Sequence, residues 1–169
     1  RWAGKPIQGL IVVRDDSPIH SLHELAGTTV AFPSPDAFVA HAVPMVALRQ
    51  AGVTVHPRFA GNQDGALAQL KARQVTAAAV NSRFLDTYAE RERLRFRVIH
   101  ASEPYLELPV LIHPRVPPAS AAALREALLG MADDPAAEAA LRAARGQGFV
   151  PANERDYDNV RFIYRAIGQ

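Results

Sequence analysis

Cysteine is absent from this chain of 169 residues, which excludes disulfide bridges, thiolate metal sites and cysteine nucleophiles. Chains without cysteine suit both the cytoplasm and the periplasm, so this absence leaves the compartment open. Long apolar runs are missing as well, and no stretch approaches the ~20 residues that a membrane-spanning helix needs. The chain starts at Arg1 with neither a methionine nor a signal peptide, and we therefore expect a processed or excised fragment.

A surplus of one charge is also lacking. The 19 Lys and Arg residues nearly balance the 17 Asp and Glu residues, which gives a formal net charge of +2. Because the basic residues are scattered and form no stripe, nucleic acid is not an expected partner. The six histidines show no HxH or HExxH spacing, and Ser34 lacks the GxSxG context of a nucleophile. We therefore expect no metal site, no cofactor and no catalytic triad.

Apolar segments are plentiful: 49% of the residues are hydrophobic and 21% are charged, so the chain can bury a core. From residue 28 to residue 99, short apolar runs alternate with segments in which apolar residues recur at helical spacing. This alternation predicts an α/β fold built on a doubly wound parallel sheet. The predicted strands are 7–13, 28–32, 54–59, 75–80 and 94–99, and the predicted helices are 22–26 (capped by Ser21), one from Phe38 onward, 64–72 and 83–93.

The pattern changes after residue 102. One apolar run, 108–112, is flanked by prolines and predicts a last strand in a return connection. Only helical patterns follow, at 119–132, 135–145 and 154–167. We therefore expect the last third of the chain to be mostly helical.

The first candidate site lies where the predicted strand 28–32 passes into the next helix. Asp36 stands at the expected N-cap, so free backbone N–H groups would open at the carboxyl end of a buried strand. Ligands bind at that edge in open α/β sheets, and a helix N-terminus suits an anion. Asp36 either caps the helix or orients a ligand, while Phe38 and His41 either wall a pocket or belong to the core. The candidate contacts here are Ser34, Asp36, Ala37, Phe38 and Val39.

Further candidates follow the next two predicted strands at the same edge of the sheet. Gln63 and Asn81 stand where specificity contacts occur in such a fold. Asp64 is either a ligand contact or the cap of the next helix. Arg83 is either an anion contact or a solvated residue of a first helical turn, where a cation is disfavoured unless a bound group needs it.

Four stretches, in this order, carry a resemblance to a known family: SPIHSLHELAGTTVAFPSPDAF, ALAQLKARQVTAAAVNS, LRFRVIHASEPY and LPVLIHP. The chain resembles the phosphate and phosphonate substrate-binding proteins of ABC transporters over about residues 8–157. The resemblance implies the type 2 periplasmic-binding-protein fold, in which two α/β lobes close over a ligand. It also implies a periplasmic protein that delivers a small, anionic ligand to a membrane permease or reports it to an attached sensor kinase.

Lobe boundaries follow from the same resemblance. It implies that residues 1–14 are a crossing strand from the first lobe and that residues 15–102 are a complete second lobe. Residues 103–169 would be the return crossing and the C-terminal part of the first lobe, whose leading part is absent. Because an incomplete lobe leaves a strand edge and apolar surface uncovered, we expect a homodimer that forms through it.

The ligand residues of that family are replaced in this chain. Its Ser-Thr-Ser signature falls on Ala37, Phe38 and Val39; its histidine falls on Gln63, and its two acidic residues fall on Arg83 and Leu108. Each lost hydroxyl was a hydrogen bond worth ~1 to 3 kcal/mol to a charged ligand. We therefore expect a larger, partly apolar anion in place of phosphate or a simple phosphonate.

Two other classes of protein share the fold that this resemblance implies. One is the cytoplasmic effector-binding domain of a LysR-type regulator. The other is a cofactor-biosynthesis enzyme, which would need a general acid or base; the candidates are Asp36, His41 and Asp64.

Overall fold

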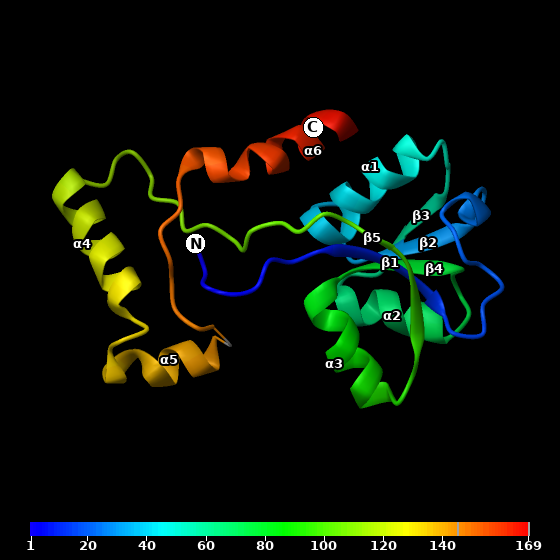
Figure 1. The fold of residues 1–169 in the computed structure, drawn as a ribbon, viewed down its shortest axis with the longest axis horizontal. Helices are drawn as coiled ribbons and strands as arrows, with labels where there is room; N and C mark the ends of the chain where they lie inside the picture. The colour runs from blue at the N-terminus through cyan, green and yellow to red at the C-terminus, as the bar shows by residue number, and fades with distance from the viewer. Residues whose placement is uncertain (145, 169) are drawn as a thin grey trace. The chain divides into compact units, whose positions relative to one another are not determined.

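The computed structural model describes residues 1–144 and 146–168 and divides the chain into two compact units (Figure 1). The first, which we call the helical unit, combines Arg1–Pro6 with Leu106–Asp158. The second, the α/β unit, combines Ile7–Tyr105 with the residues from Asn159 onward. No helix within the described residues is long and apolar enough to cross a membrane.

A five-stranded sheet forms the centre of the α/β unit, in the order β3-β2-β4-β1-β5. The strands are β1 (Gly9–Arg14), β2 (Thr29–Phe32), β3 (His56–Phe59), β4 (Ala77–Asn81) and β5 (Phe96–Ala101). β2 pairs in parallel with β3 and β4, whereas β1 pairs antiparallel with both β4 and β5. The α/β fold is therefore confirmed, but the sheet is mixed and not wholly parallel. β3 contains Pro57 and lies at an edge, as a strand that lacks one N–H donor requires.

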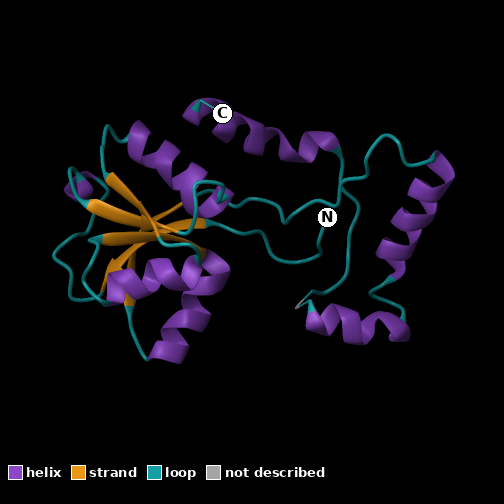
Figure 2. Cartoon of the chain, turned by 180° about the vertical axis from the view of Figure 1, so that it is seen from behind, coloured by secondary structure: helices purple, strands orange, loops and turns teal. Residues whose placement is uncertain are grey.

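Helices lie on both faces of this sheet (Figure 2). Because successive side chains of a strand point to opposite faces, β1 contributes to two separate cores. Leu10 and Val12 pack with residues of α2 (Gln63–Lys71) and α3 (Ser82–Glu92). Ile11 and Val13 lie in the opposite core with Leu48 of α1 (Val43–Gln50). The apolar runs of the sequence thus become strands that are buried on both sides.

The helix that follows β2 opens as a π-helix, η2 (Phe38–Ala42), and continues as α1. Pro44 lies in the first turn of α1, where it has no N–H to give to the carbonyl of residue 40 and where its ring would crowd that carbonyl. The wider turn of a π-helix accommodates this interruption. A helix after Asp36 was predicted and is confirmed; its π-helical first turn was not predicted.

The short helix before β2 is smaller than predicted and is capped differently. It is a 3-10 helix, η1 (His23–Leu25), and Ser21 does not cap it. Instead, the carboxylate of Glu24 accepts hydrogen bonds from the backbone N–H groups of His20 (2.7 Å) and Ser21 (2.8 Å). These bonds lower the pKa of Glu24. Glu24 therefore organises the turn from its C-terminal side.

The helical unit contains α4 (Pro118–Gly130), η3 (Pro135–Ala137), α5 (Glu138–Ala143) and η4 (Glu154–Tyr157). The predicted helical regions 119–132 and 135–145 are confirmed here, and the third, 154–167, corresponds to η4 together with α6. Arg145 and Gln169, which were placed in the C-terminal region, lie outside the described residues. The last helix, α6 (Asp158–Ile167), leaves this unit at its first residue and packs in the α/β unit through Ile163, beside Val39 and Val43.

The predicted strand at residues 108–112 is wrong. The structure has no strand there, and the side chains of Leu108, Val110, Leu111 and Ile112 are exposed. A strand exists only where a neighbour receives its backbone hydrogen bonds, and the described residues offer this segment no pairing partner beyond one bond from the Trp2 N–H to the Leu108 carbonyl (3.1 Å). The segment has the apolar pattern of a strand, but no described strand pairs with it.

Candidate functional site

The ends of five strands meet at one edge of the sheet, which we call the carboxyl edge. β2, β3 and β4 run in parallel and end there at Phe32, Phe59 and Asn81. β1 starts there, because Gly9 lies opposite Asn81 in the antiparallel register, and β5 ends there, because Ala101 lies opposite Leu10. The helices η2, α2 and α3 all begin just after this edge, so several helix N-termini gather where an anion would be favoured.

Asp36 does not cap the helix, and its predicted N-cap role is wrong. Ala37 occupies the N-cap position and no side chain caps it. The Ala37 N–H donates to the Ser34 carbonyl (3.3 Å), which closes a turn that leaves Asp36 exposed. The first bond of the π-helix runs from Ala42 N to Ala37 O (3.0 Å), so the N–H groups of residues 38–41 precede the hydrogen-bond ladder of the helix.

Phe38 and Val39 are held by packing. The Phe38 ring contacts Tyr105 edge-on, with ring centroids 4.9 Å apart, and Tyr164 of α6 at 5.5 Å. Val39 is buried in the same cluster. Burial, with the nearby Glu103 carboxylate, raises the pKa of the Tyr105 hydroxyl. The core alternative for Phe38 is therefore observed, and a ligand contact by Phe38 stays a prediction.

Gln63 and Asn81 come together at the carboxyl edge. The Gln63 Oε1 accepts from the Asn81 N–H (3.0 Å), and the Asn81 Oδ1 in turn accepts from the Arg83 N–H (3.0 Å), which caps α3. One acceptor atom of each side chain is thus used by the fold. The amide groups are fixed in place by these bonds, which is the state that a specificity contact needs.

Asp64 does not cap α2; Asn62 does, because its Oδ1 accepts from the Gly65 N–H (2.7 Å). Asp64 instead forms an ion pair with Arg91 of α3 (3.0 Å), and this hydrogen bond is the main reason that the pKa of Arg91 is raised. Arg83 is exposed in the first turn of α3. These placements favour a structural role for Asp64 and put Arg83 at the start of α3, next to the edge where an anion is predicted.

Three aromatic side chains gather beside the start of η2. His41 contacts Phe32 (5.0 Å between centroids) and Phe59 (5.2 Å), both edge-on. The His41 Nδ1 lies 2.8 Å from the Pro35 carbonyl, so this ring is oriented by the turn that contains Ser34. Phe59 was not singled out from the sequence. It could have been found from the sequence, because Phe59 is the last residue of a predicted edge strand and Phe32 is the last residue of another predicted strand.

Further polar side chains, which were not singled out from the sequence, make hydrogen bonds at the carboxyl edge where β1 begins. The Gln8 N–H donates to the Ser82 Oγ (3.2 Å), the Gln8 Nε2 donates to the Ser102 carbonyl (2.7 Å), and the Gly9 N–H donates to the Ser102 Oγ (3.0 Å). These bonds join the beginning of β1 to α3 and to the segment after β5. In residues 1–144 and 146–168, no group of three or more His, Asp or Glu side chains is placed to hold a metal ion.

Residues 3–157 match a family described as the ABC transporter, phosphonate, periplasmic substrate-binding protein family. No match was found among curated protein sequences.

Solved structures share the fold. XAC2383 from Xanthomonas citri bound to ATP has a TM-score of 0.85 and 23% identity, with 99% of this chain and 68% of that chain covered. PhnD1 from Prochlorococcus marinus in complex with methylphosphonate has a TM-score of 0.76 and 18% identity, covering 96% and 67%. A binding protein component of an ABC phosphonate transporter from Pseudomonas aeruginosa has a TM-score of 0.75 and 16% identity, covering 97% and 60%. This chain therefore spans about two thirds of the length of these proteins.

Proposed function

Because this chain belongs to the family of periplasmic substrate-binding proteins of phosphonate ABC transporters, we propose that it binds a small anionic solute at the carboxyl edge of the α/β unit. It presents the solute to a membrane permease or to an attached sensor kinase, in the periplasm, and it performs no chemistry on it. The proposed contacts are Ser34, Asp36, Ala37, Phe38, Val39, Gln63, Asn81 and Arg83.

One observation carries this proposal: three helices begin at the edge where Gln63 and Asn81 are already fixed by the Gln63 Oε1 to Asn81 N–H bond of 3.0 Å. Backbone N–H groups at helix starts attract negative charge without a charged side chain. The two amide side chains then add donors and acceptors in set directions. The geometry thus supports binding and orientation of an anion.

We further assign the chain to the type 2 periplasmic-binding-protein architecture, with ligand closure between two lobes. Residues 15–102 form the second lobe, and residues 1–14 and 103–169 belong to the crossings and to part of the first lobe. The compact α/β unit contains the whole of residues 15–102, which supports their assignment to one lobe; it also takes in β1 and the part of α6 from Asn159 onward, which pack against that lobe.

Phosphate and methylphosphonate are expected to bind weakly or not at all. The positions at which the resembling family carries Ser-Thr-Ser and histidine are Ala37, Phe38, Val39 and Gln63 here, and each missing hydrogen bond to a charged ligand costs about 1.5 to 3 kcal/mol. Two such losses already weaken binding by at least about a hundredfold. Isothermal titration calorimetry should instead detect binding of an anion larger than methylphosphonate. ATP is one probe, because the structurally similar XAC2383 was solved bound to ATP.

The control for this titration is Gln63→His, which restores the family's imidazole at one position and is expected to strengthen methylphosphonate binding. Micromolar affinity of the unaltered chain for phosphate or methylphosphonate would contradict the proposed ligand preference. A complete lack of binding by every anion would contradict the proposed function itself.

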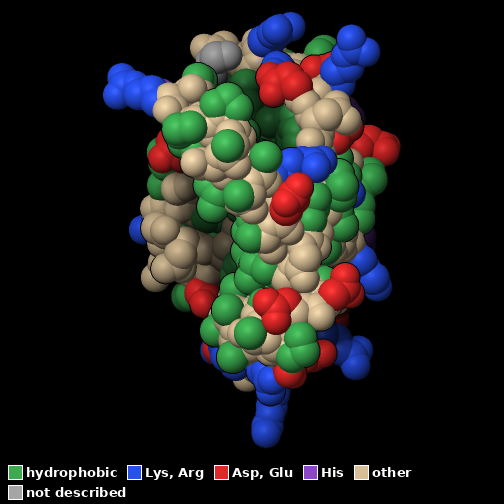
Figure 3. All heavy atoms as spheres, turned by 90° about the vertical axis from the view of Figure 1, so that its left-hand side faces the viewer, with side chains coloured by type: hydrophobic (Ala, Val, Ile, Leu, Met, Phe, Trp, Pro, Cys, Tyr) green, Lys and Arg blue, Asp and Glu red, His purple; other side chains and the backbone are tan. Residues whose placement is uncertain are grey.

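A homodimer formed through the helical unit is the second expectation. Leu108, Val110, Leu111 and Ile112 expose their side chains in a segment that forms no strand, and no residue of α4 is buried. Figure 3 shows apolar side chains spread over one face of this unit between scattered charges. Pairing of two 108–112 segments would satisfy their backbone groups and cover this surface.

Light scattering coupled to gel filtration should find a dimer for the unaltered chain and a monomer for Leu111→Asp. Leu111 is 82% exposed, so the substitution costs little within one chain. Phe162→Asp is the matched control, since Phe162 is 62% exposed on α6 and lies outside the proposed interface. A monomer at all concentrations, or a dimer that survives Leu111→Asp, would contradict this interface.

A further inference from the structure

An exposed aromatic surface adjoins the start of η2, and the function proposed above does not use it. Phe59 ends β3 with 46% of its side chain exposed. One side of its ring faces His41, with centroids 5.2 Å apart, and the fully buried Phe32 lies 6.2 Å away. A single exposed phenylalanine needs no explanation, but this one is supported by two further rings at the edge where a ligand is expected.

The fold restrains the backbone of Phe59 and the ring of His41. His41 is held through its Nδ1, 2.8 Å from the Pro35 carbonyl, and through its edge-on contact with Phe32. The backbone of Phe59 is held by the parallel pairing of β3 with β2, in which it lies opposite Phe32, and its ring contacts that of His41. A rigid aromatic surface loses little conformational entropy when a ring stacks on it, and that makes it a good contact.

Its position relative to the helix starts matters as well. His41 lies within one turn of the beginning of η2 at Phe38. Phe59 lies three residues before Asn62, the N-cap of α2. A molecule whose ring covers Phe59 would therefore bind beside the segment that leads into α2, where backbone N–H groups favour an anionic substituent.

We propose that Phe59 and His41 form a binding surface for the planar ring of the solute, so that the ligand class is a ring-bearing anion. This proposal rests on the proposed function, because the same edge must bind the anionic group. Phe59 supplies an aromatic face, and His41 supplies an imidazole whose orientation is set by Pro35. A ring gains from such contacts beyond the apolar area that it buries, whereas an aliphatic group of the same size gains only the area.

Two matched ligands and two matched variants test the proposal on the full chain. The ligands are phenylphosphonate and cyclohexylphosphonate, which have the same anionic group and similar size but differ in aromaticity. The variants are Phe59→Leu and Phe84→Leu. Phe84 is also 46% exposed and lies in the first turn of α3, and no ring contact involves it in the described part of the chain.

Calorimetry should give about 3- to 10-fold tighter binding of phenylphosphonate than of cyclohexylphosphonate. Phe59→Leu should abolish this ratio, and Phe84→Leu should leave it unchanged. Circular dichroism checks that both variants remain folded. Equal affinity for the two ligands, or a ratio that survives Phe59→Leu, would overturn the proposal.

Adenosine, an uncharged ring compound, separates this proposal from the one on which it rests. Ring proton signals of Phe59 and His41 in NMR spectra should shift on addition of adenosine, even where no phosphonate binds. If those signals move and every anion fails to bind, the ring surface is supported and the proposed function is wrong. If neither adenosine nor phenylphosphonate moves them, the ring surface is wrong.

Discussion

Gly9→Ala should destabilise the α/β unit by about 3 kcal/mol, at the upper end of what an overpacked core usually costs. A Cβ atom added to Gly9 would lie 2.1 Å from the Val39 carbonyl oxygen and 3.1 Å from its carbonyl carbon. It would also lie 3.4 Å from the Cδ of Pro44. Two of these three atoms are backbone, so no rotation of a side chain relieves the contact.

The close approach exists because the π-helix η2 packs directly on β1 and β4. An added methyl group must push η2 away from β1, and it would separate Val39, Ala42 and Val43 from the core cluster in which they are buried. The start of η2 belongs to the proposed site, so the same substitution should also weaken binding of any anion that the unaltered chain retains.

Urea denaturation followed by far-ultraviolet circular dichroism measures this loss of stability. Gly130→Ala is the matched control: apart from its chain neighbours and the backbone of its own helix, no described atom lies within 4 Å of the place that the new Cβ would take, and the backbone of Gly130 is not left-handed. That change should be neutral or stabilising by up to ~1 kcal/mol. Equal stabilities of the Gly9→Ala and unaltered chains would mean that η2 does not contact β1 as described.

Much of the α/β unit was predictable from the sequence. Runs such as residues 7–13 and 75–80 are largely apolar without alternation and are short, which is typical of a strand covered on both faces. The direction of β1 was not predictable, because an apolar run is the same for a parallel and an antiparallel neighbour. The strand prediction for residues 108–112 was wrong for a related reason. A strand needs a neighbouring strand to pair with, and an apolar run does not specify which segment that is.

The site was predictable to a smaller extent. Gln63 and Asn81 could be placed at one edge because each follows a strand, and the structure joins them by a hydrogen bond. Capping was one of two alternatives for both Asp36 and Asp64, yet no side chain caps η2, Asp64 pairs with Arg91, and Asn62 caps α2. Several polar residues compete for each cap, and backbone geometry, which the sequence does not state, decides which one reaches the free N–H group.

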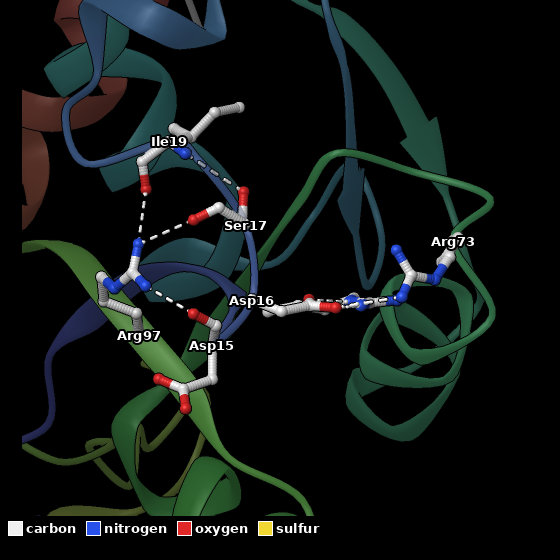
Figure 4. A network of polar contacts seen from close by, with 7 residues as sticks. Asp15, Asp16, Ser17, Ile19, Arg73 and Arg97 are labelled. Carbon is white, nitrogen blue, oxygen red and sulfur yellow. Dashed lines mark hydrogen bonds and ion pairs between the residues drawn. The ribbon is translucent and has the colours of Figure 1, made fainter.

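A second large effect is expected at the opposite end of the sheet, where Arg97 of β5 holds the loop after β1 (Figure 4). The Arg97 Nη1 donates to the carbonyls of Ser17 (2.9 Å) and Ile19 (3.2 Å), and its Nη2 donates to the carbonyl of Asp15. The loop thus has its backbone acceptors satisfied by one planar guanidinium. A lysine has a single ammonium on a flexible stem and cannot reach three carbonyls in this way.

Asp16, in the same loop, is bound differently. Its carboxylate pairs with Arg14 and with Arg73 (3.0 Å), and the hydrogen bond from Arg14 is the main cause of the lowered pKa of Asp16. The Arg73 and Asp16 side chains are 72% and 57% exposed. An ion pair as exposed as this one contributes ~0 to 1 kcal/mol. The two arginines Arg97 and Arg73 therefore contact one loop with very different expected consequences.

Arg97→Met should destabilise the chain by about 2 to 4 kcal/mol, because hydrogen bonds from a charged donor contribute about 1.5 to 3 kcal/mol each and some of the released carbonyls will reach water. Arg97→Lys should lose an intermediate amount, and Arg73→Met should change stability by less than about 1 kcal/mol. Urea denaturation gives the three values, and amide hydrogen exchange in residues 14–20 should accelerate only in the Arg97 variants. If Arg73→Met is as destabilising as Arg97→Met, the loop is held by its surface ion pairs and the role assigned to the Arg97 guanidinium is wrong.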